Sequence, residues 1–242
     1  DQVAQAREEL IAAYRGLLER QSVLRADTLE LTELPELGRR ERQTARRLGN
    51  DQEAVRAALD ALRQDTEGMA DAAVFSYVHE MMDAWAVQVR DRLYDARVGL
   101  DVTARQLRIA EAIRRQVEAL EALQDGTPPE FAQGEAGEGG ADGGGGQGGG
   151  SEAILPPTAE LMRLKGLQES IYLETRAIDE DRSMAPDERA AMIDELGRMQ
   201  RDVLDLGQRL LEQLVPARPM PGDAGGAGDA PPAEPSSPES SP

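Results

Sequence analysis

His79 is the only histidine in the chain, and it lies in the segment Val-His-Glu-Met-Met-Asp at residues 78–83. The His-Glu pair is similar to the start of a zinc-peptidase helix, which needs a second histidine four residues later to share the metal. Position 83 is Asp83 instead. A di-iron site in a helical bundle needs two Glu-x-x-His pairs, and Ser76 precedes His79 by three residues. We therefore expect His79 to be a polar-face or boundary residue.

The segment 134–150, GEAGEGGADGGGGQGGG, superficially resembles a phosphate-binding loop or a calcium repeat. A phosphate loop needs Lys-Ser/Thr after its glycines, between a strand and a helix, whereas Gln147 follows Gly146. A calcium repeat needs recurring aspartates and apolar residues, and this segment has only Asp142. The composition instead predicts a flexible linker, because glycine loses the most backbone entropy on ordering and offers no side chain to bury.

Carboxylate pairs such as Glu30 and Glu33 could bind a cation or act as acid and base. The chain has 46 acidic residues, however, so such pairs arise by chance on exposed helix faces. Ser76, Ser170 and Ser183 have no neighbouring base in the sequence. We therefore predict no catalytic residue, no cofactor, no metal ligand and no enzyme activity.

The composition narrows the classes of partner. A net charge of −19 argues against general binding to nucleic acid, since that affinity comes largely from basic residues that neutralise phosphates. Residues 39–47 hold five arginines interleaved with Glu41 and no aromatic residue, a pattern typical of a solvated helix face. There is no cysteine, which excludes disulfides and thiolate sites. No run of 18 apolar residues occurs, so we expect no transmembrane segment.

Heptad and 3–4 spacing predicts helices throughout residues 1–125. Val3, Leu10, Leu17, Leu24 and Leu31 follow each other at seven-residue intervals, which predicts a first helix that ends near Pro35. Further stripes predict a second helix over 36–65, across Gly49, and a third over 74–96, which Gly99 closes. Thr103 and Gln106 predict a capping box for a fourth helix that ends near Gln124. In the third helix we expect Trp85 to contribute most to the core.

These patterns predict an all-α fold of long antiparallel helices. Residues 1–125 form either an up-and-down four-helix bundle or coiled-coil hairpins that need another chain. Residues 126–155 form a flexible glycine-rich linker, residues 156–215 a separate αα-hairpin, and residues 216–242 a disordered tail of Pro, Ser and acidic residues.

The last predicted helix has the most regular heptads of the chain. Two isolated helices expose too much apolar surface to be stable, so we expect the hairpin to dock on the bundle, to self-associate or to bind a partner helix. The candidate partner-binding residues form one stripe along this helix: Met192, Leu196, Met199, Val203, Leu206, Leu210 and Leu214.

A series of features over residues 70–180 supports one resemblance. A helix containing Met81 and Met82 precedes a Gly-x-x-Thr and Gln-containing helix at 99–123. A glycine-rich linker follows, then Leu-Pro-Pro-x-x-Glu-Leu at 155–161 and a helix containing Leu167 and Gln168. This order is similar to that of a loose group of uncharacterised bacterial cell-envelope proteins. The resemblance implies an exported, helical, coiled-coil-bearing protein, and it supplies no catalytic or ligand residues.

The first hypothesis for function is therefore a non-enzymatic helical interaction or scaffold protein that binds partner helices, or itself, through apolar stripes, with no nucleic acid and no small-molecule ligand. The alternative is a helical-bundle metal-binding protein or enzyme centred on His79 and nearby acids. Because the chain starts at Asp1 and not at methionine, we expect a processed N-terminus, for which a removed secretory signal is one explanation. The expected location is the bacterial cell envelope or periplasm, with the cytoplasm as the other possibility.

Overall fold

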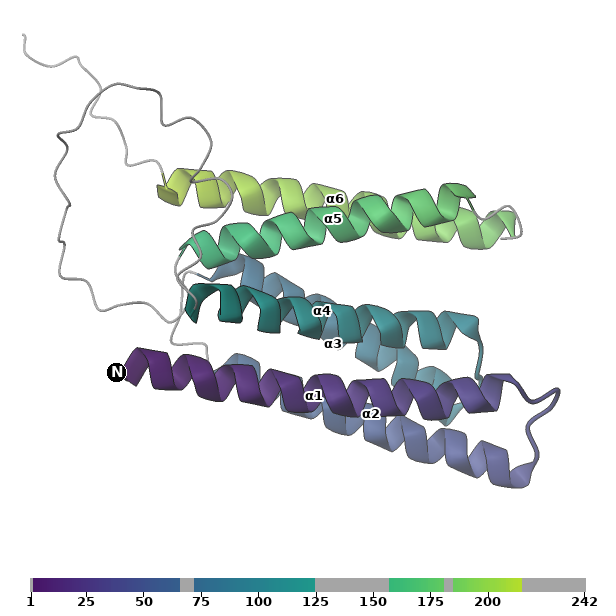
Figure 1. Ribbon diagram of the computed structural model, residues 1–242. Helices are drawn as coiled ribbons and strands as arrows, with labels where there is room; N and C mark the ends of the chain where they lie inside the picture. The colour runs from purple at the N-terminus through teal and green to yellow at the C-terminus, as the bar shows by residue number, and fades with distance from the viewer. Residues whose placement is uncertain (1, 66–71, 125–156, 181–184, 215–242) are drawn as a thin grey trace, which may run out of the picture.

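The computed structural model describes residues 2–65, 72–124, 157–180 and 185–214, and every regular element within them is an α-helix (Figure 1). The predicted all-α fold is confirmed. The predicted linker and tail, residues 126–155 and 216–242, lie wholly outside the described residues. The helices are α1 (Gln2–Thr32), α2 (Arg39–Asp65), α3 (Ala73–Tyr94), α4 (Leu100–Gln124), α5 (Pro157–Glu180) and α6 (Pro186–Leu214).

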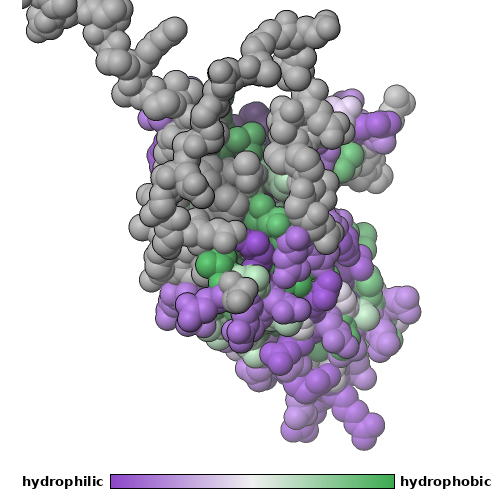
Figure 2. Space-filling view, turned by 60° about the vertical axis from the view of Figure 1, so that its left-hand side comes forward, coloured by the Kyte–Doolittle hydropathy of each residue, from purple (hydrophilic) through white to green (hydrophobic). Residues whose placement is uncertain are grey.

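Helices α1 to α4 form an up-and-down four-helix bundle. Helix α1 packs against α2 and α4, and α3 packs against the same two helices on the other side. In Figure 1, α1 and α2 form one layer, α3 and α4 lie above it, and α5 and α6 form a third layer. The bundle is therefore the correct choice between the two arrangements that the periodicity left open. In Figure 2, hydrophilic side chains cover most of the lower part of the molecule, where Figure 1 places α1 and α2.

The turn between α3 and α4 differs from the prediction. Helix α3 ends at Tyr94, and Ala96 adopts a left-handed conformation with φ of 54°. Its amide and that of Arg97 close the helix by bonding the carbonyl groups of Leu93 and Arg92. This is the geometry in which glycine is favoured, although the residue here is alanine. Gly99 does not close α3, because its carbonyl instead accepts the first hydrogen bonds of α4.

The predicted capping box at Thr103 and Gln106 is wrong. Helix α4 begins at Leu100, so both residues lie inside it, and both are buried. The Gln106 amide donates to the Thr28 hydroxyl, and Gln21 and Gln52 hydrogen-bond each other beside it. A layer of buried polar groups from three helices therefore crosses the bundle core. Such a layer penalises any shift in helix register, because a shift leaves buried amides without partners.

Gly49 permits a close approach between α2 and α3. A Cβ atom at this position would lie 2.6 Å from the Tyr94 ring, well inside van der Waals contact. Gly49 is buried, and the Tyr94 hydroxyl donates to Asn50 on the same helix. The glycine that interrupts the α2 pattern is thus explained by packing against Tyr94.

The predicted αα-hairpin is formed by α5 and α6, and it packs on the bundle mainly through α5, which contacts α3 and α4. Buried residues of the hairpin, among them Leu167 and Met199, belong to the same hydrophobic core as the bundle. Docking, one of the three expected fates of the hairpin, is what the structure shows. None of the described helices combines the length and apolarity needed to cross a membrane.

Candidate functional site

The residues predicted to bind a partner lie mostly inside the molecule. In α6, Leu196, Met199, Val203, Leu206 and Leu210 are buried, and Met192 is partly buried. Leu214 ends the helix, and its side chain is not among those that the structure describes. We call this set the inner stripe. It packs against the rest of the chain, so the partner site cannot be this stripe while the hairpin is docked.

Glu160 fixes the start of the hairpin to the bundle. Its Oε2 accepts hydrogen bonds from the backbone amides of Val74, at 2.7 Å, and Phe75, at 3.3 Å. These amides belong to the first turn of α3, whose own first residues supply no side-chain cap. A carboxylate at a helix N-terminus satisfies free N–H groups and is favoured by the helix dipole. The hairpin therefore completes a helix of the bundle.

Arg163 is the buried counter-charge of Glu160. Its Nη1 lies 3.1 Å from Glu160, its Nε donates to Gln116 on α4 at 2.6 Å, and its guanidinium stacks 5.2 Å from the centre of the Phe75 ring. Burial lowers the pKa of Arg163, and the Glu160 carboxylate opposes that shift. A buried ion pair with these extra partners is costly to break from one side, since the remaining charge is left in a nonpolar environment.

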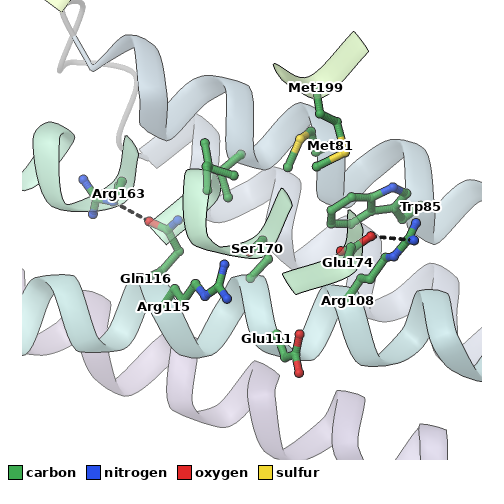
Figure 3. Close-up of a pocket in the computed structure, with 13 residues that line it drawn as sticks. Met81, Trp85, Arg108, Glu111, Arg115, Gln116, Arg163, Ser170, Glu174 and Met199 are labelled. Atoms are coloured by element: carbon green, nitrogen blue, oxygen red, sulfur yellow. Dashed lines mark hydrogen bonds and ion pairs between the residues drawn. The ribbon is translucent and has the colours of Figure 1, made fainter. Parts of the chain in front are cut away.

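A second polar contact joins α6 to the bundle. The Trp85 indole Nε1 donates to Glu195 at 3.2 Å, and Arg108 pairs with Glu195. The Arg108 Nη2 also lies 2.6 Å from Glu174 (Figure 3). Burial raises the pKa of Glu174, and the positive charge of Arg108 opposes this effect. Trp85 is therefore a residue of the bundle–hairpin interface as well as of the core.

A small cavity lies between these two contacts. Figure 3 shows Trp85, Met81 and Met199 on one side of it, and Arg115 and Gln116 on another. Its volume is about 30 Å³, which holds roughly one water molecule. Pockets for organic ligands are typically about ten times larger or more. This cavity is therefore a packing defect at an interface and not a substrate site.

A large apolar hollow runs along the solvent-exposed side of the hairpin, between α5 and α6. It consists of two adjoining parts of about 810 and 570 Å³, both of which are lined by Tyr172 and Gln200. We call the two parts together the outer groove. Large apolar side chains are exposed in it: Tyr172 is 62% exposed, Leu204 59% and Leu211 62%. Contiguous exposed apolar surface of this kind marks interaction sites in soluble proteins.

The outer groove follows a second heptad pattern on α6. Each of its residues comes directly after a residue of the inner stripe, so α6 carries a second, partly apolar row beside the first, in which three large apolar residues share the face with two glycines and one glutamine. We call this set the outer stripe: Ile193, Gly197, Gln200, Leu204, Gly207 and Leu211. A helix in a two-helix hairpin needs one seam, whereas a second seam is typical of a helix with a further helical neighbour. This pattern was visible in the sequence, but the more apolar inner stripe concealed it.

The rim of the groove carries both signs of charge. Lys165, Arg176 and Arg189 provide positive charge, and Glu169 and Asp179 provide negative charge. The groove is therefore close to neutral in a chain with a net charge of −19. General charge repulsion, which opposes contacts elsewhere on the surface, is weak at this face.

His79, the centre of the alternative functional hypothesis, is buried and not a boundary residue. Its Nε2 lies 2.6 Å from the Tyr14 hydroxyl, and its ring contacts Phe75 at 4.5 Å between centroids. Burial and the nearby charge of Arg163 lower the pKa of His79 to about 4. The imidazole is thus neutral at pH 7, and its Nε2 forms a hydrogen bond with the Tyr14 hydroxyl. Among the described residues, no three histidine or acidic side chains gather as metal ligands would.

Compared with protein-family models, curated proteins and solved structures, the chain matches none.

Proposed function

We propose that this chain is a non-enzymatic helical scaffold protein, and that the outer groove of the α5–α6 hairpin binds an amphipathic helix. The observation that carries the proposal is the exposure of Tyr172, Leu204 and Leu211 along a continuous hollow, while the inner stripe is already covered. Leaving such residues in water is unfavourable by about 1.5–3 kcal/mol for each large apolar side chain, relative to burial. A partner that covers them gains this free energy.

The shape of the groove favours a helix as its occupant. From Ile193 to Leu211 the outer stripe spans 18 residue steps, or about 27 Å at 1.5 Å per residue. A helix of about five turns matches that length. The 4–3 spacing of the outer stripe is also the spacing at which a helix meets another helix side by side.

Docking of the hairpin gives this groove a fixed geometry. The contacts of Glu160 with Val74 and of Glu195 with Trp85 hold both helices of the hairpin on the bundle. A groove whose two walls are already positioned loses less conformational entropy on binding than a flexible hairpin would. We propose that the bundle serves as the support and the outer groove as the binding face.

Location in the bacterial cell envelope or periplasm remains part of the proposal. It rests on the sequence resemblance described above. Fractionation of cells that produce the full chain, followed by detection in the periplasmic fraction, supports this location. Exclusive recovery in the cytoplasmic fraction contradicts it.

Site-specific photo-cross-linking tests the proposed binding face. A photo-reactive amino acid replaces Leu204 in the full chain, in cells, and in a control variant it replaces Arg20, which is exposed on α1. We expect a discrete cross-linked product from position 204 and none of that size from position 20. The absence of any product from position 204, at protein levels where the chain is folded, would overturn the proposal.

A further inference from the structure

We propose that a second copy of this chain covers the outer groove, with the two hairpins packed face to face, α6 antiparallel on α6 and α5 antiparallel on α5, about a two-fold axis level with Asp202. This inference rests on the proposed function and names its partner. It follows from the arrangement of the outer stripe, from the charges on α5 and from the size of the face.

The residues of the outer stripe are spaced symmetrically about Asp202, so the stripe can pair with the same stripe of a second copy that runs antiparallel. Ile193 and Leu211 lie nine residues on either side of Asp202, Gly197 and Gly207 lie five residues away, and Gln200 and Leu204 lie two residues away. Antiparallel pairing about Asp202 therefore places Ile193 against Leu211 of the second copy and Gly197 against Gly207. Large apolar residues meet at both ends of the contact, and glycines meet between them.

The level of Asp202 on α5 follows from contacts within the hairpin. Gln168 and Gln200 hydrogen-bond each other, and a Cβ atom at Gly207 would lie 3.3 Å from Leu164. Because α5 and α6 are antiparallel, Asp202 is level with the stretch between Gln168 and Leu164. Asp202 lies two sevenths of the way from Gln200 to Gly207, and the same fraction of the way from Gln168 to Leu164 falls close to Leu167.

An axis at Leu167 makes the charges on α5 complementary. Lys165 lies two residues before Leu167, and Glu169 lies two residues after it. The two-fold operation therefore places Lys165 opposite Glu169 of the second copy, and Glu169 opposite the second Lys165. The outer stripe on α6 and the charged pair on α5 are therefore both compatible with a single two-fold axis.

The area available suits a weak dimer. Two adjacent helices present a face about 20 Å wide, and the groove is about 27 Å long, so two such faces bury on the order of 1,000 Å² in total. This value is at the lower end for specific interfaces. We therefore expect a dimer that dissociates in the micromolar range, which dilution can reveal.

Single-cysteine variants test the antiparallel arrangement, because the chain contains no cysteine of its own. Full-length Ile193→Cys and Leu211→Cys proteins are oxidised separately and as a mixture, and Arg20→Cys replaces Leu211→Cys in a control mixture. We expect a disulfide-linked dimer mainly in the Ile193→Cys and Leu211→Cys mixture. Efficient dimer formation by Ile193→Cys alone, or equal yields in the control mixture, would contradict the proposed axis.

Charge reversal tests the α5 pair in solution, with the dissociation constant measured by sedimentation of the full chain. Lys165→Glu and Glu169→Lys each place like charges opposite each other at two sites, and we expect each to weaken the dimer about tenfold, or about 1.4 kcal/mol. The double variant restores opposite charges, and we expect its dissociation constant to return to within about threefold of the original. Failure of the double variant to recover, with unchanged circular dichroism, overturns the pairing.

The two proposals fail in different ways. If the purified chain is a monomer up to about 500 µM and position 204 still cross-links in cells to a different polypeptide, the second-copy inference is wrong and the helix-binding groove stands. If the chain is a monomer and position 204 yields no product, both are wrong.

Discussion

The Glu160 carboxylate accepts a hydrogen bond of 2.7 Å from the Val74 amide, so a residue of the hairpin caps a helix of the bundle that lies 86 positions earlier in the chain. Its other oxygen bonds Arg163, which is itself buried. Glu160 therefore bonds a helix amide with one oxygen and a buried positive charge with the other. Because the site is buried, water does not replace either bond if the carboxylate is removed.

We expect Glu160→Ala to lower the free energy of unfolding by about 3–5 kcal/mol, because it leaves Arg163 as a buried charge without its counter-ion. Denaturant unfolding followed by circular dichroism measures this change. Glu180→Ala is the matched control on the same helix, since Glu180 forms an exposed pair with Arg176, and we expect a change below about 1 kcal/mol. Equal effects of the two substitutions would mean that Glu160 does not anchor the hairpin.

Glu195→Ala should loosen the contact between α6 and the bundle. It leaves the buried Trp85 indole N–H without its acceptor, at a cost of about 1–3 kcal/mol. Since Trp85 is the only tryptophan, its fluorescence reports this contact directly, and we expect emission to move to longer wavelength as water reaches the ring. Asp194→Ala, a change at the exposed neighbouring residue, should leave the emission unchanged. A shift of the same size in both variants contradicts the assignment.

Gly49→Ala should destabilise the protein by about 1–3 kcal/mol, although alanine is the better helix former. The added methyl group would lie 2.6 Å from the Tyr94 ring, and the helix cannot absorb that overlap without moving. Gly16→Ala is the control, because no atom lies within 4 Å of its added Cβ and we expect about 1 kcal/mol of stabilisation. Thermal unfolding of both variants measures the difference, and a gain in stability for Gly49→Ala would contradict the close packing.

His79 should make the protein lose stability as the pH falls from about 6.5 towards 4. Its pKa is lowered to about 4 in the folded protein, so the unfolded chain binds the proton first in this range. The expected loss is about 3 kcal/mol over the window, on the basis of 1.36 kcal/mol per pKa unit. Glu174 acts in the opposite direction, because its pKa is raised by burial.

Comparison with His79→Gln isolates the histidine contribution, since glutamine does not titrate. We expect denaturant unfolding of this variant to show a flatter dependence on pH between 4 and 6.5 than the unmodified chain. Parallel pH profiles for the two proteins would show that His79 is not held neutral by burial.

Much of the helical layout was predictable from the spacing of apolar residues. The stripe from Val3 to Leu31 predicted α1 to within a few residues, and Pro35 correctly marked the break after it. The spacing of apolar residues indicates which face of a helix is buried, and each of these helices is buried along one face. It does not record what covers them, which is why the docking of the hairpin on α3 and α4 was left open.

Two of the errors concern buried polar residues. His79 and Gln106 are polar by residue type, and sequence reasoning placed one at a boundary and the other in a helix cap. Both are buried beside a polar partner from a distant segment: the Tyr14 hydroxyl bonds His79, and the Gln106 amide nitrogen donates to Thr28. Such pairings join segments that are far apart in the sequence, so the spacing of residues within one helix does not predict them. Glu160 is a similar case, since its partner amides belong to α3.

The covering of the outer groove by another helix is the central claim, and cysteine accessibility in intact cells measures it most directly. The full chain carries either Leu204→Cys or Arg20→Cys, and both are treated with a membrane-permeant maleimide before and after mild denaturation. We expect Cys at position 20 to react at once and Cys at position 204 to react only after denaturation. Immediate and equal labelling at both positions would show that the groove is open to solvent, contrary to the claim.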